Sequence, residues 1–490
     1  MDYPPLWTAS ATTEWVDKQL EVCRNRYRID GQPQSVTFRD LCRQWGWAKR
    51  SDVYTHLLHR YPAKLLAYIP IFFLSSTYAE MSDLVLDPFA GTGTVLLESI
   101  SHPYSPRNCY GVEINPLARL IAKVKTTPLS PEILQKRAEQ LYRLMREFQN
   151  RPPIPEFPSS TFWFRSEVLE DIAKARICIE RMDATLDERD FLLACLSSII
   201  RDVSWADPKV APPVKLRADK FPKTRQPAIE QMIAKKSTAD VLTCLQRAIN
   251  KNMARMKQFY EMLDSRPVEH RARVEIIWDD VRSLARGTYV SRGDVSKHNA
   301  ESIDGQVGLV ITSPPYINAQ KYIRTTKLEL WCLGLESQDS ITNLDKSLIG
   351  TEKVFSDEYR ELIPVGNSKA DQLLVIIHKT SPRQAGIVSR YFRDMRLAMQ
   401  AIHRVLKPGG YFVMVVGDNR VCNQIVENHK ILAEIAQENN GFTVESILVD
   451  TIRSRGIITK RHATAGVIPE EWVLVMRKYP VDYLNGQGEA

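Results

Sequence analysis

The chain has 490 residues, with 66 Lys and Arg against 58 Asp and Glu and a formal net charge of +8. This length exceeds that of an ordinary single domain and predicts a core that carries substantial insertions. The mild basic excess fits a polyanionic partner but does not establish one, because many proteins are mildly basic. No apolar run approaches the roughly 20 residues of a membrane-spanning helix.

Cysteine spacing and the first residues of the chain set further limits. The eight cysteines are scattered, without a Cys-x-x-Cys pair, and no histidines cluster at metal-ligand spacing. Neither a disulfide framework nor a structural zinc site is therefore expected, and no metal is predicted. Residues 1–5 do not lead from a basic segment into an apolar one, so the sequence predicts a cytoplasmic protein.

Residues 1–55 are predicted to form an N-terminal extension, with a short helix near residues 36–41. The half of the core that binds a cofactor is predicted to follow at residues 56–128.

A strand that ends in a glycine turn is the first strong signal. The strand ends at Asp87, and Gly91 and Gly93 then let the backbone approach a ligand closely. The turn lacks the Gly-Lys-Ser/Thr ending of a triphosphate-binding loop and the Gly-x-Gly-x-x-Gly spacing of a dinucleotide site. The next strand ends at Glu113, where an acid binds ribose hydroxyls in doubly wound sheets. The alternative is a structural βαβ unit without a ligand.

Residues 129–272 have a mostly helical pattern and are predicted to form an inserted helical domain. Ser130-Pro131 begins one helix, and the apolar residues 191–200 lie in another. A basic, proline-rich stretch lies within the same segment and could follow phosphates, although a solvated connector would have the same composition. Its cations are Lys209, Lys215, Arg217, Lys220, Lys223 and Arg225.

The second half of the core is predicted at residues 273–336, with strands that end at Asp294 and Ser313. Asp279-Asp280 is an alternative end for the earlier strand, because it follows an apolar run of its own. Residues 337–388 are predicted as a second, polar insertion. Residues 389–480 complete the core with a helix over 391–405, a stop at Lys407-Pro408-Gly409-Gly410, and strands at 411–416, 444–448 and 472–476. The chain is therefore predicted to be an α/β protein with a doubly wound, mostly parallel, seven-stranded sheet.

Ser313-Pro314-Pro315-Tyr316 is the most informative motif. Two consecutive prolines have a fixed φ and no N–H, so the Pro314 carbonyl is a preorganised acceptor, and the serine hydroxyl is a second. The exocyclic amine of cytosine or adenine is a poor nucleophile until such acceptors converge on it. The tyrosine ring offers a flat face for an unstacked base. A proline-rich turn with an exposed tyrosine is the structural alternative.

These motifs together resemble the S-adenosylmethionine-dependent DNA amino-methyltransferases over most of residues 56–125 and 288–478. Serine at the first position of the loop is typical of the members that modify N4 of cytosine, whereas adenine-N6 members more often carry Asp or Asn. The resemblance implies a Rossmann-like methyltransferase sheet. The motif order is not permuted, because the segment that closes over the cofactor comes first and the catalytic loop last.

The resemblance also implies functional residues and S-adenosyl-L-methionine as the cofactor. The implied catalytic residues are Ser313, Pro314, Pro315 and Tyr316. The implied cofactor-binding residues are Tyr61, Pro62, Asp87, Phe89, Ala90, Gly91, Thr92, Gly93, Thr94, Glu113, Asn115 and Asp294. With this motif order, the target-recognition element is expected in an insertion, first among residues 129–272. A second DNA-binding candidate is the basic pair Arg453 and Arg455.

The function that the resemblance implies is site-specific methylation of cytosine N4 in DNA after base flipping. The implied partners are double-stranded DNA and a cognate restriction endonuclease that acts on the same site. Three alternatives stay open: an adenine-N6 DNA methyltransferase, an RNA (tRNA) amino-methyltransferase, and a non-catalytic nucleic-acid-binding module. A covalent route to ring carbon is disfavoured, since no cysteine follows a proline as that chemistry requires.

Overall fold

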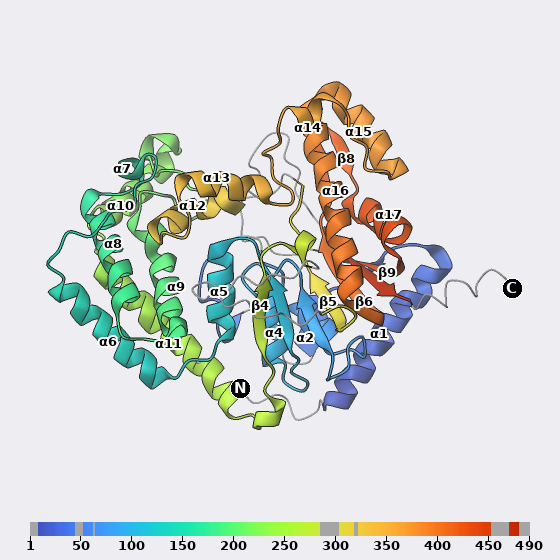
Figure 1. Ribbon diagram of the computed structural model, residues 1–490, viewed down its shortest axis with the longest axis horizontal. Helices are drawn as coiled ribbons and strands as arrows, with labels where there is room; N and C mark the ends of the chain where they lie inside the picture. The colour runs from blue at the N-terminus through green and yellow to red at the C-terminus, as the bar shows by residue number, and fades with distance from the viewer. Residues whose placement is uncertain are drawn as a thin grey trace.

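The computed structural model describes residues 8–44, 52–61, 64–284, 303–317, 322–451 and 470–479. A central β-sheet carries helices on both of its faces, and a large group of helices lies beside it (Figure 1). This arrangement is a mixed α/β fold consistent with a Rossmann-like methyltransferase, as the sequence predicted.

Within the described residues, the main sheet has eight strands in the order β1-β9-β10-β6-β5-β2-β3-β4. Its strands run parallel to their neighbours, except that β10 is antiparallel to both β9 and β6. Their bounds are β1 (Gln34–Ser35), β2 (Leu84–Asp87), β3 (Cys109–Val112), β4 (Val274–Trp278), β5 (Val307–Thr312), β6 (Leu406–Val416), β9 (Phe442–Thr451) and β10 (Glu470–Lys478). A separate hairpin is formed by β7 (Asn419–Val421) and β8 (Gln424–Val426).

The predicted count of seven strands is wrong, because the sheet has one additional strand at its edge. The extra strand, β1, comes from the N-terminal extension and pairs with β9. Its two residues, Gln34 and Ser35, carry no apolar run, so the usual signal for a strand is absent from the sequence. The predicted start of β6 also needs correction. The helix ends at Val405 as expected, but the strand begins at Leu406, and the Lys-Pro-Gly-Gly segment lies inside it.

Alternate residues of the central strands face opposite layers of helices. Val85 and Leu309 belong to the core beneath the N-terminal helices, whereas Leu86 and Val310 belong to the core beneath the C-terminal helices. All six residues of β5 are buried, as expected for a parallel strand covered on both faces. The helices of the first layer are α1 (Ala9–Asp30), α2 (Phe38–Gln44), α3 (Tyr68–Leu74) and α4 (Thr94–Ser101), and those of the second are α15 (Ser368–Thr380), α16 (Pro382–Val405) and α17 (Asn428–Asn440).

Residues 131–264 are mainly helical, and their apolar side chains form one continuous core with α4, α5 (Pro116–Thr126) and α12 (Tyr322–Cys332). Two helix starts are fixed by side-chain caps: Ser130 accepts a hydrogen bond from Ile133, and Thr185 and Glu188 form a reciprocal capping box. The helices are α6 (Pro131–Glu147), α7 (Ser160–Trp163), α8 (Ser166–Arg181), α9 (Leu186–Val203), α10 (Gln226–Ser237) and α11 (Val241–Asp264).

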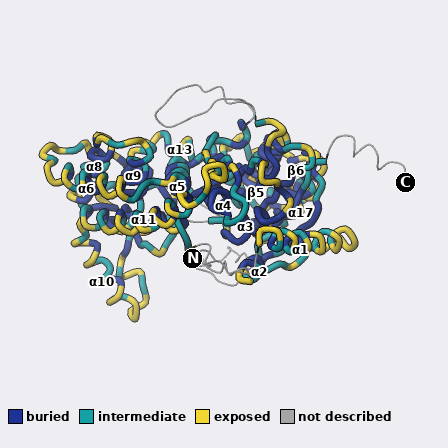
Figure 2. The backbone as a smooth tube through the Cα atoms, turned by 90° about the horizontal axis from the view of Figure 1, so that it is seen from below, coloured by how far each residue is buried: buried dark blue, intermediate teal, exposed yellow. Residues whose placement is uncertain are grey.

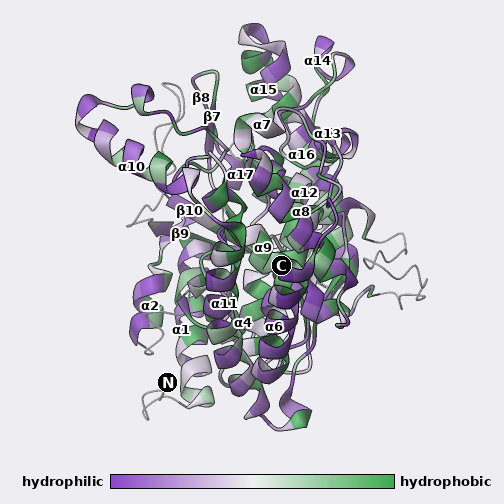
Figure 3. Cartoon of the chain, turned by 90° about the vertical axis from the view of Figure 1, so that its left-hand side faces the viewer, coloured by the Kyte–Doolittle hydropathy of each residue, from purple (hydrophilic) through white to green (hydrophobic). Residues whose placement is uncertain are grey.

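Helix α10 and the loop before it project from the rest of this helical region (Figures 2 and 3). The second polar insertion contributes α13 (Gln338–Ser347) and α14 (Asp357–Arg360), which lie above the upper edge of the sheet in Figure 1. In the part of the chain that the structure describes, no helix combines the length and apolar character needed to span a membrane.

Candidate active site

The glycine turn and the Ser-Pro-Pro-Tyr loop lie side by side. They follow β2 and β5, which are neighbours at the point where the strand order of the sheet reverses, the usual ligand position in doubly wound sheets. A direct contact joins them, because the hydroxyl of Thr312 donates a buried hydrogen bond of 2.6 Å to Oδ1 of Asp87. Two segments more than 200 residues apart in the sequence therefore form one site.

Both glycines of the turn adopt backbone conformations that other residues rarely adopt. Gly91 has φ +52° and Gly93 has φ +72°, in the left-handed region that favours glycine. A Cβ on Gly93 would also lie 3.0 Å from the Cβ of Ala122. The second glycine is thus required for close packing of the turn on α5, and the first leaves space above the turn.

Glu113 braces the glycine turn from the end of β3. Its Oε2 accepts a hydrogen bond of 2.8 Å from the N–H of Gly91, and its Oε1 accepts one of 2.8 Å from the N–H of Asn115. Burial raises the pKa of the Glu113 carboxyl, against the opposing effect of these two hydrogen bonds. Each carboxylate oxygen still has a further lone pair for a ligand hydroxyl.

Asn115 connects three segments around the same point. Its Oδ1 accepts a hydrogen bond of 3.0 Å from the N–H of Leu117 and so caps α5. Its Nδ2 donates to the hydroxyl of Tyr61 at 3.2 Å and to that of Thr326 at 3.3 Å. The segment before the glycine turn is thereby tied both to β3 and to α12, the helix that follows the catalytic loop.

Asp87 is almost fully buried, and burial raises its pKa to about 7. The hydrogen bonds from Thr312 and from the N–H of Phe89, both to Oδ1, act in the opposite direction. A carboxyl with this folded-state pKa is uncharged over much of the mildly acidic range, so the site is sensitive to pH.

Replacing Asp87 with asparagine is expected to remove a pH dependence of stability. Because the folded state holds this proton more tightly than the unfolded state, its stabilising effect is complete below about pH 4 and is lost as the pH rises through about 7. The total is at most about 4 kcal/mol, from about 1.4 kcal/mol per pKa unit. The amide oxygen of the introduced side chain can still accept both hydrogen bonds. Denaturant unfolding of both proteins at pH 5 and pH 8 measures the difference, and a gap between them that does not change with pH would contradict the assignment.

One cavity is lined by both halves of the site. Of the predicted residues, Tyr61, Phe89, Gly91, Glu113, Asn115, Ser313 and Pro315 line it. Seven other predicted residues lie in these two loops or at their ends but are not among the lining residues within the described chain: Asp87, Ala90, Thr92, Gly93, Thr94, Pro314 and Tyr316. Pro62, Asp294, Arg453 and Arg455 lie outside the described residues.

The acid pair that follows β4 also lines the cavity. This pair, Asp279 and Asp280, is the alternative to Asp294 in the sequence interpretation. Asp280 is engaged by Arg282, whose Nη2 lies 2.6 Å from Oδ2 of Asp280. Asp279, by contrast, makes no hydrogen bond or ion pair with any described residue. Its carboxylate is therefore the one of the two that remains available to a ligand.

Sequence reasoning missed a third wall of the cavity, which comes from the second insertion. Ser347, Leu348 and Ile349 line the cavity beside Asp280. The only sequence signal there is an apolar pair followed by glycine inside a polar segment, and this does not indicate where the segment folds.

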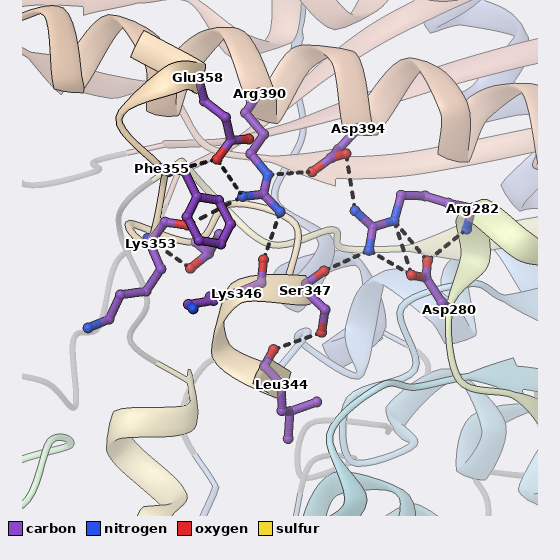
Figure 4. A network of polar contacts seen from close by, with 11 residues as sticks. Asp280, Arg282, Leu344, Lys346, Ser347, Lys353, Phe355, Glu358, Arg390 and Asp394 are labelled. Carbon is purple, nitrogen blue, oxygen red and sulfur yellow. Dashed lines mark hydrogen bonds and ion pairs between the residues drawn. The ribbon is translucent and has the colours of Figure 1, made fainter. Parts of the chain in front are cut away.

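Two arginines hold this wall against the core (Figure 4). Arg282 donates to the carbonyl of Ser347 at 2.6 Å and forms an ion pair of 3.1 Å with Asp394 on α16. Arg390, also on α16, donates to the carbonyl of Lys346 at 2.7 Å. The ion pairs fix both guanidinium groups, so the backbone at residues 346–347 has a defined position next to the cavity.

Gly350 lies directly against the catalytic loop. It has φ +76°, and a Cβ at this position would lie 2.9 Å from the carbonyl oxygen of Tyr316. The loop is also held from its other end, since Asn419 donates a hydrogen bond of 3.0 Å to the carbonyl of Ile317. Burial raises the pKa of Tyr316 well above its ordinary value.

Replacing Gly350 with alanine is expected to lower kcat at least tenfold, since the new methyl group must displace the catalytic loop. The positive φ adds a stability loss of about 1–2 kcal/mol. Gly305→Ala is the matched control, because Gly305 has φ +66° but no atom within 4 Å of its Cβ position. Thermal unfolding and steady-state rates separate the two effects: both variants should lose stability and only Gly350→Ala should lose kcat. Equal rates for the two variants would contradict the contact.

The cations of the basic stretch near α10 differ in their exposure and in their contacts, which the sequence did not indicate. Lys215 is half-buried, with its ammonium 4.5 Å from the ring centre of Phe162, and Arg217 pairs with Asp219 at 2.8 Å. Arg225 lies over the ring of Phe221. The remaining members, Lys209, Lys220 and Lys223, are exposed.

A partly buried arginine links this stretch to the catalytic half. Arg201 on α9 donates to the carbonyl of Val210 at 2.9 Å and pairs with Glu329 on α12 at 3.0 Å.

Within the described ranges, no group of three or more His, Cys, Asp or Glu residues is arranged to hold a metal ion.

Comparison with known proteins gives related enzymes over most of the chain, although no protein-family model matches it. The chain is 24% identical over 403 residues to the type II methyltransferase M.MvaI of Kocuria varians, covering 79% of this chain and 82% of that protein. It is 22% identical over 410 residues to the type II methyltransferase M.BsoBI of Geobacillus stearothermophilus, covering 76% and 75%. A stretch of 153 residues is 31% identical to the type II methyltransferase M.AvaI of Nostoc sp., covering 29% and 32%. Together with the fold and the shared cavity, these similarities support a DNA methyltransferase.

Proposed function

We propose that this chain is a site-specific DNA methyltransferase that transfers a methyl group from S-adenosyl-L-methionine to the N4 amine of cytosine after base flipping. The observation that carries the proposal is the cavity that Gly91 and Glu113 share with Ser313 and Pro315. Donor and acceptor have to meet within van der Waals contact for direct transfer, and a common cavity satisfies this requirement.

The residues of the cavity fit the cofactor. Glu113 has free lone pairs for the two ribose hydroxyls, and Asp279, which has no described partner, suits the adenine amine. The turn around Gly91 leaves space for the methionine part. When bound, the cofactor supplies a methyl group on a positively charged sulfur, so the chain needs no metal to activate it.

Ser313 and Pro314 would act on the target amine. Their hydroxyl and carbonyl oxygens accept its N–H bonds, which directs the nitrogen lone pair toward the methyl carbon. As the nitrogen–carbon bond forms, the carbon–sulfur bond breaks with its electron pair on sulfur. The methylated nitrogen then loses a proton to water or to Ser313, so no dedicated base is required. Tyr316 would provide the face on which the flipped base lies.

Recognition of the duplex is assigned to the insertions. Residues 129–272 are the proposed target-recognition region, with phosphate contacts from the exposed Lys209, Lys220 and Lys223 near the projecting α10. Arg453 and Arg455 remain a second candidate. The other segments keep their proposed roles: 1–55 as an extension, 56–128 and 273–336 as the two halves of the core, 337–388 as a second insertion and 389–480 as its completion. A cognate restriction endonuclease is the proposed biological partner.

Two alternative substrates are tested by one assay. Methyl incorporation from labelled cofactor is measured on unmodified duplex DNA and on total tRNA, and the product is digested to nucleosides for mass spectrometry. We expect N4-methylcytosine from the DNA. Recovery of N6-methyladenine alone would contradict the base assignment, and incorporation into tRNA alone would contradict the DNA assignment.

A further inference from the structure

A groove lies beside the cavity and opens from it. It is bounded by α12, α13 and residues 348–353, and it shares Tyr322, Leu348 and Ile349 with the cavity. Gly350, which also lines the groove, lies against the carbonyl of Tyr316. The groove therefore begins where a base held at Ser313 would connect to the rest of its strand.

Three cations line this groove. They are Arg324 and Lys327, one turn apart on α12, and Lys353 on the opposite wall. None of them has a carboxylate partner among the described residues. Burial and the neighbouring Arg324 both lower the pKa of Lys327. The groove also contains Asp345 and Glu352, but each of these already takes part in an interaction of its own. The groove is thus lined by three cations and two carboxylates, and this excess of positive charge favours an anionic ligand.

The walls of the groove are held in place by groups other than these cations. The carbonyl of Lys353 accepts a hydrogen bond of 3.3 Å from Arg390, and that of Glu352 accepts one of 2.8 Å from Arg383. Figure 4 shows the Lys353 side chain extending away from the ion-pair network that holds its backbone. On the other wall, the Lys327 ammonium lies over the rings of Trp163 and Trp331, 5.3 and 5.6 Å from their centres. These contacts fix the positions of the residues that carry the cations, and the charged groups remain available to a ligand.

We propose that this groove binds the sugar–phosphate backbone of the target strand next to the flipped nucleotide, with Arg324, Lys327 and Lys353 as phosphate ligands. The proposal rests on the proposed function and adds to it. Flipping rotates a nucleotide about its own backbone, so the phosphates on either side must be held while the base leaves the stack. Arginine and lysine are the side chains suited to this contact.

The test uses Arg324→Ala/Lys353→Ala and unmethylated plasmid DNA that the parent protein methylates. The value of kcat/KM for DNA is measured between 50 and 200 mM KCl, and cofactor binding is measured by calorimetry. Each phosphate contact removed lowers the slope of log affinity against log salt by about 1, so we expect the slope to fall by about 2 and kcat/KM at low salt to fall at least tenfold. Binding of the cofactor should be unchanged.

Lys18→Ala is the matched control, because Lys18 is exposed on α1, outside the proposed target-recognition region and away from the groove (Figure 1). It should retain the parent slope, and Arg324→Lys should restore most of the activity that Arg324→Ala loses. A double variant with the parent slope and rate would overturn the groove assignment while leaving the proposed function intact. A parent protein that methylates no DNA would overturn the proposed function, and the groove assignment with it.

Discussion

Replacing Ser313 with alanine is expected to lower kcat about 10²-fold, the usual effect of deleting one preorganised group that stabilises a transition state. The hydroxyl accepts an N–H of the target amine only while the amine is being aligned, so the KM for the cofactor should not change. Steady-state kinetics with duplex DNA, together with calorimetry for the cofactor, measures both quantities.

Ser313→Asn provides the rescue variant, since its side-chain carbonyl restores an acceptor at the same position. It should recover part of the lost kcat. An alanine variant with the rate of the parent protein would show that the loop has only a structural role. An alanine variant that no longer binds the cofactor would show that Ser313 acts on the cofactor and not on the target amine.

Replacing Glu113 with alanine is expected to weaken cofactor binding by about 10²-fold or more. The carboxylate is positioned for the ribose hydroxyls, and hydrogen bonds to a charged group contribute about 1.5–3 kcal/mol each. The change also leaves the N–H of Gly91 without the acceptor that holds the glycine turn. Isothermal titration calorimetry with S-adenosyl-L-methionine measures the loss.

Glu113→Gln separates these two contributions. Glutamine keeps an acceptor for the Gly91 N–H but lacks the charge, so its affinity should fall between those of the parent and the alanine variant. Glu147→Ala, at the exposed end of α6, is the neutral control. Parent-like affinity in the Glu113→Ala variant would place the ribose elsewhere.

The fold was predictable where each strand carries its own apolar signal. The strands that end at Asp87, at Val112 just before Glu113, and at Thr312 just before Ser313 are short and apolar, and each is followed by a turn or loop with chemistry of its own. Parallel strands bring their carboxyl ends to one edge of a sheet, so the neighbourhood of the glycine turn and the catalytic loop follows from the order of the segments.

The features that could not be predicted depend on contacts between distant parts of the chain, which no local sequence pattern indicates. The edge strand β1 has two polar residues and exists because β9 offers it an unpaired edge. The cavity wall at Ser347, Leu348 and Ile349 is positioned by Arg282 and Arg390, which come from other parts of the chain. Of the two acids after β4, only the geometry of Arg282 identifies which one is engaged.

A crystal structure of the complex with S-adenosylhomocysteine tests the central claim most directly. We predict that the ribose hydroxyls contact Glu113, that the adenine amine approaches Asp279, and that the sulfur faces Ser313 and Pro314 across the shared cavity. S-adenosylhomocysteine bound in the neighbouring groove, or with its sulfur directed away from Ser313, would contradict the claim that one cavity brings the methyl donor and the target amine together.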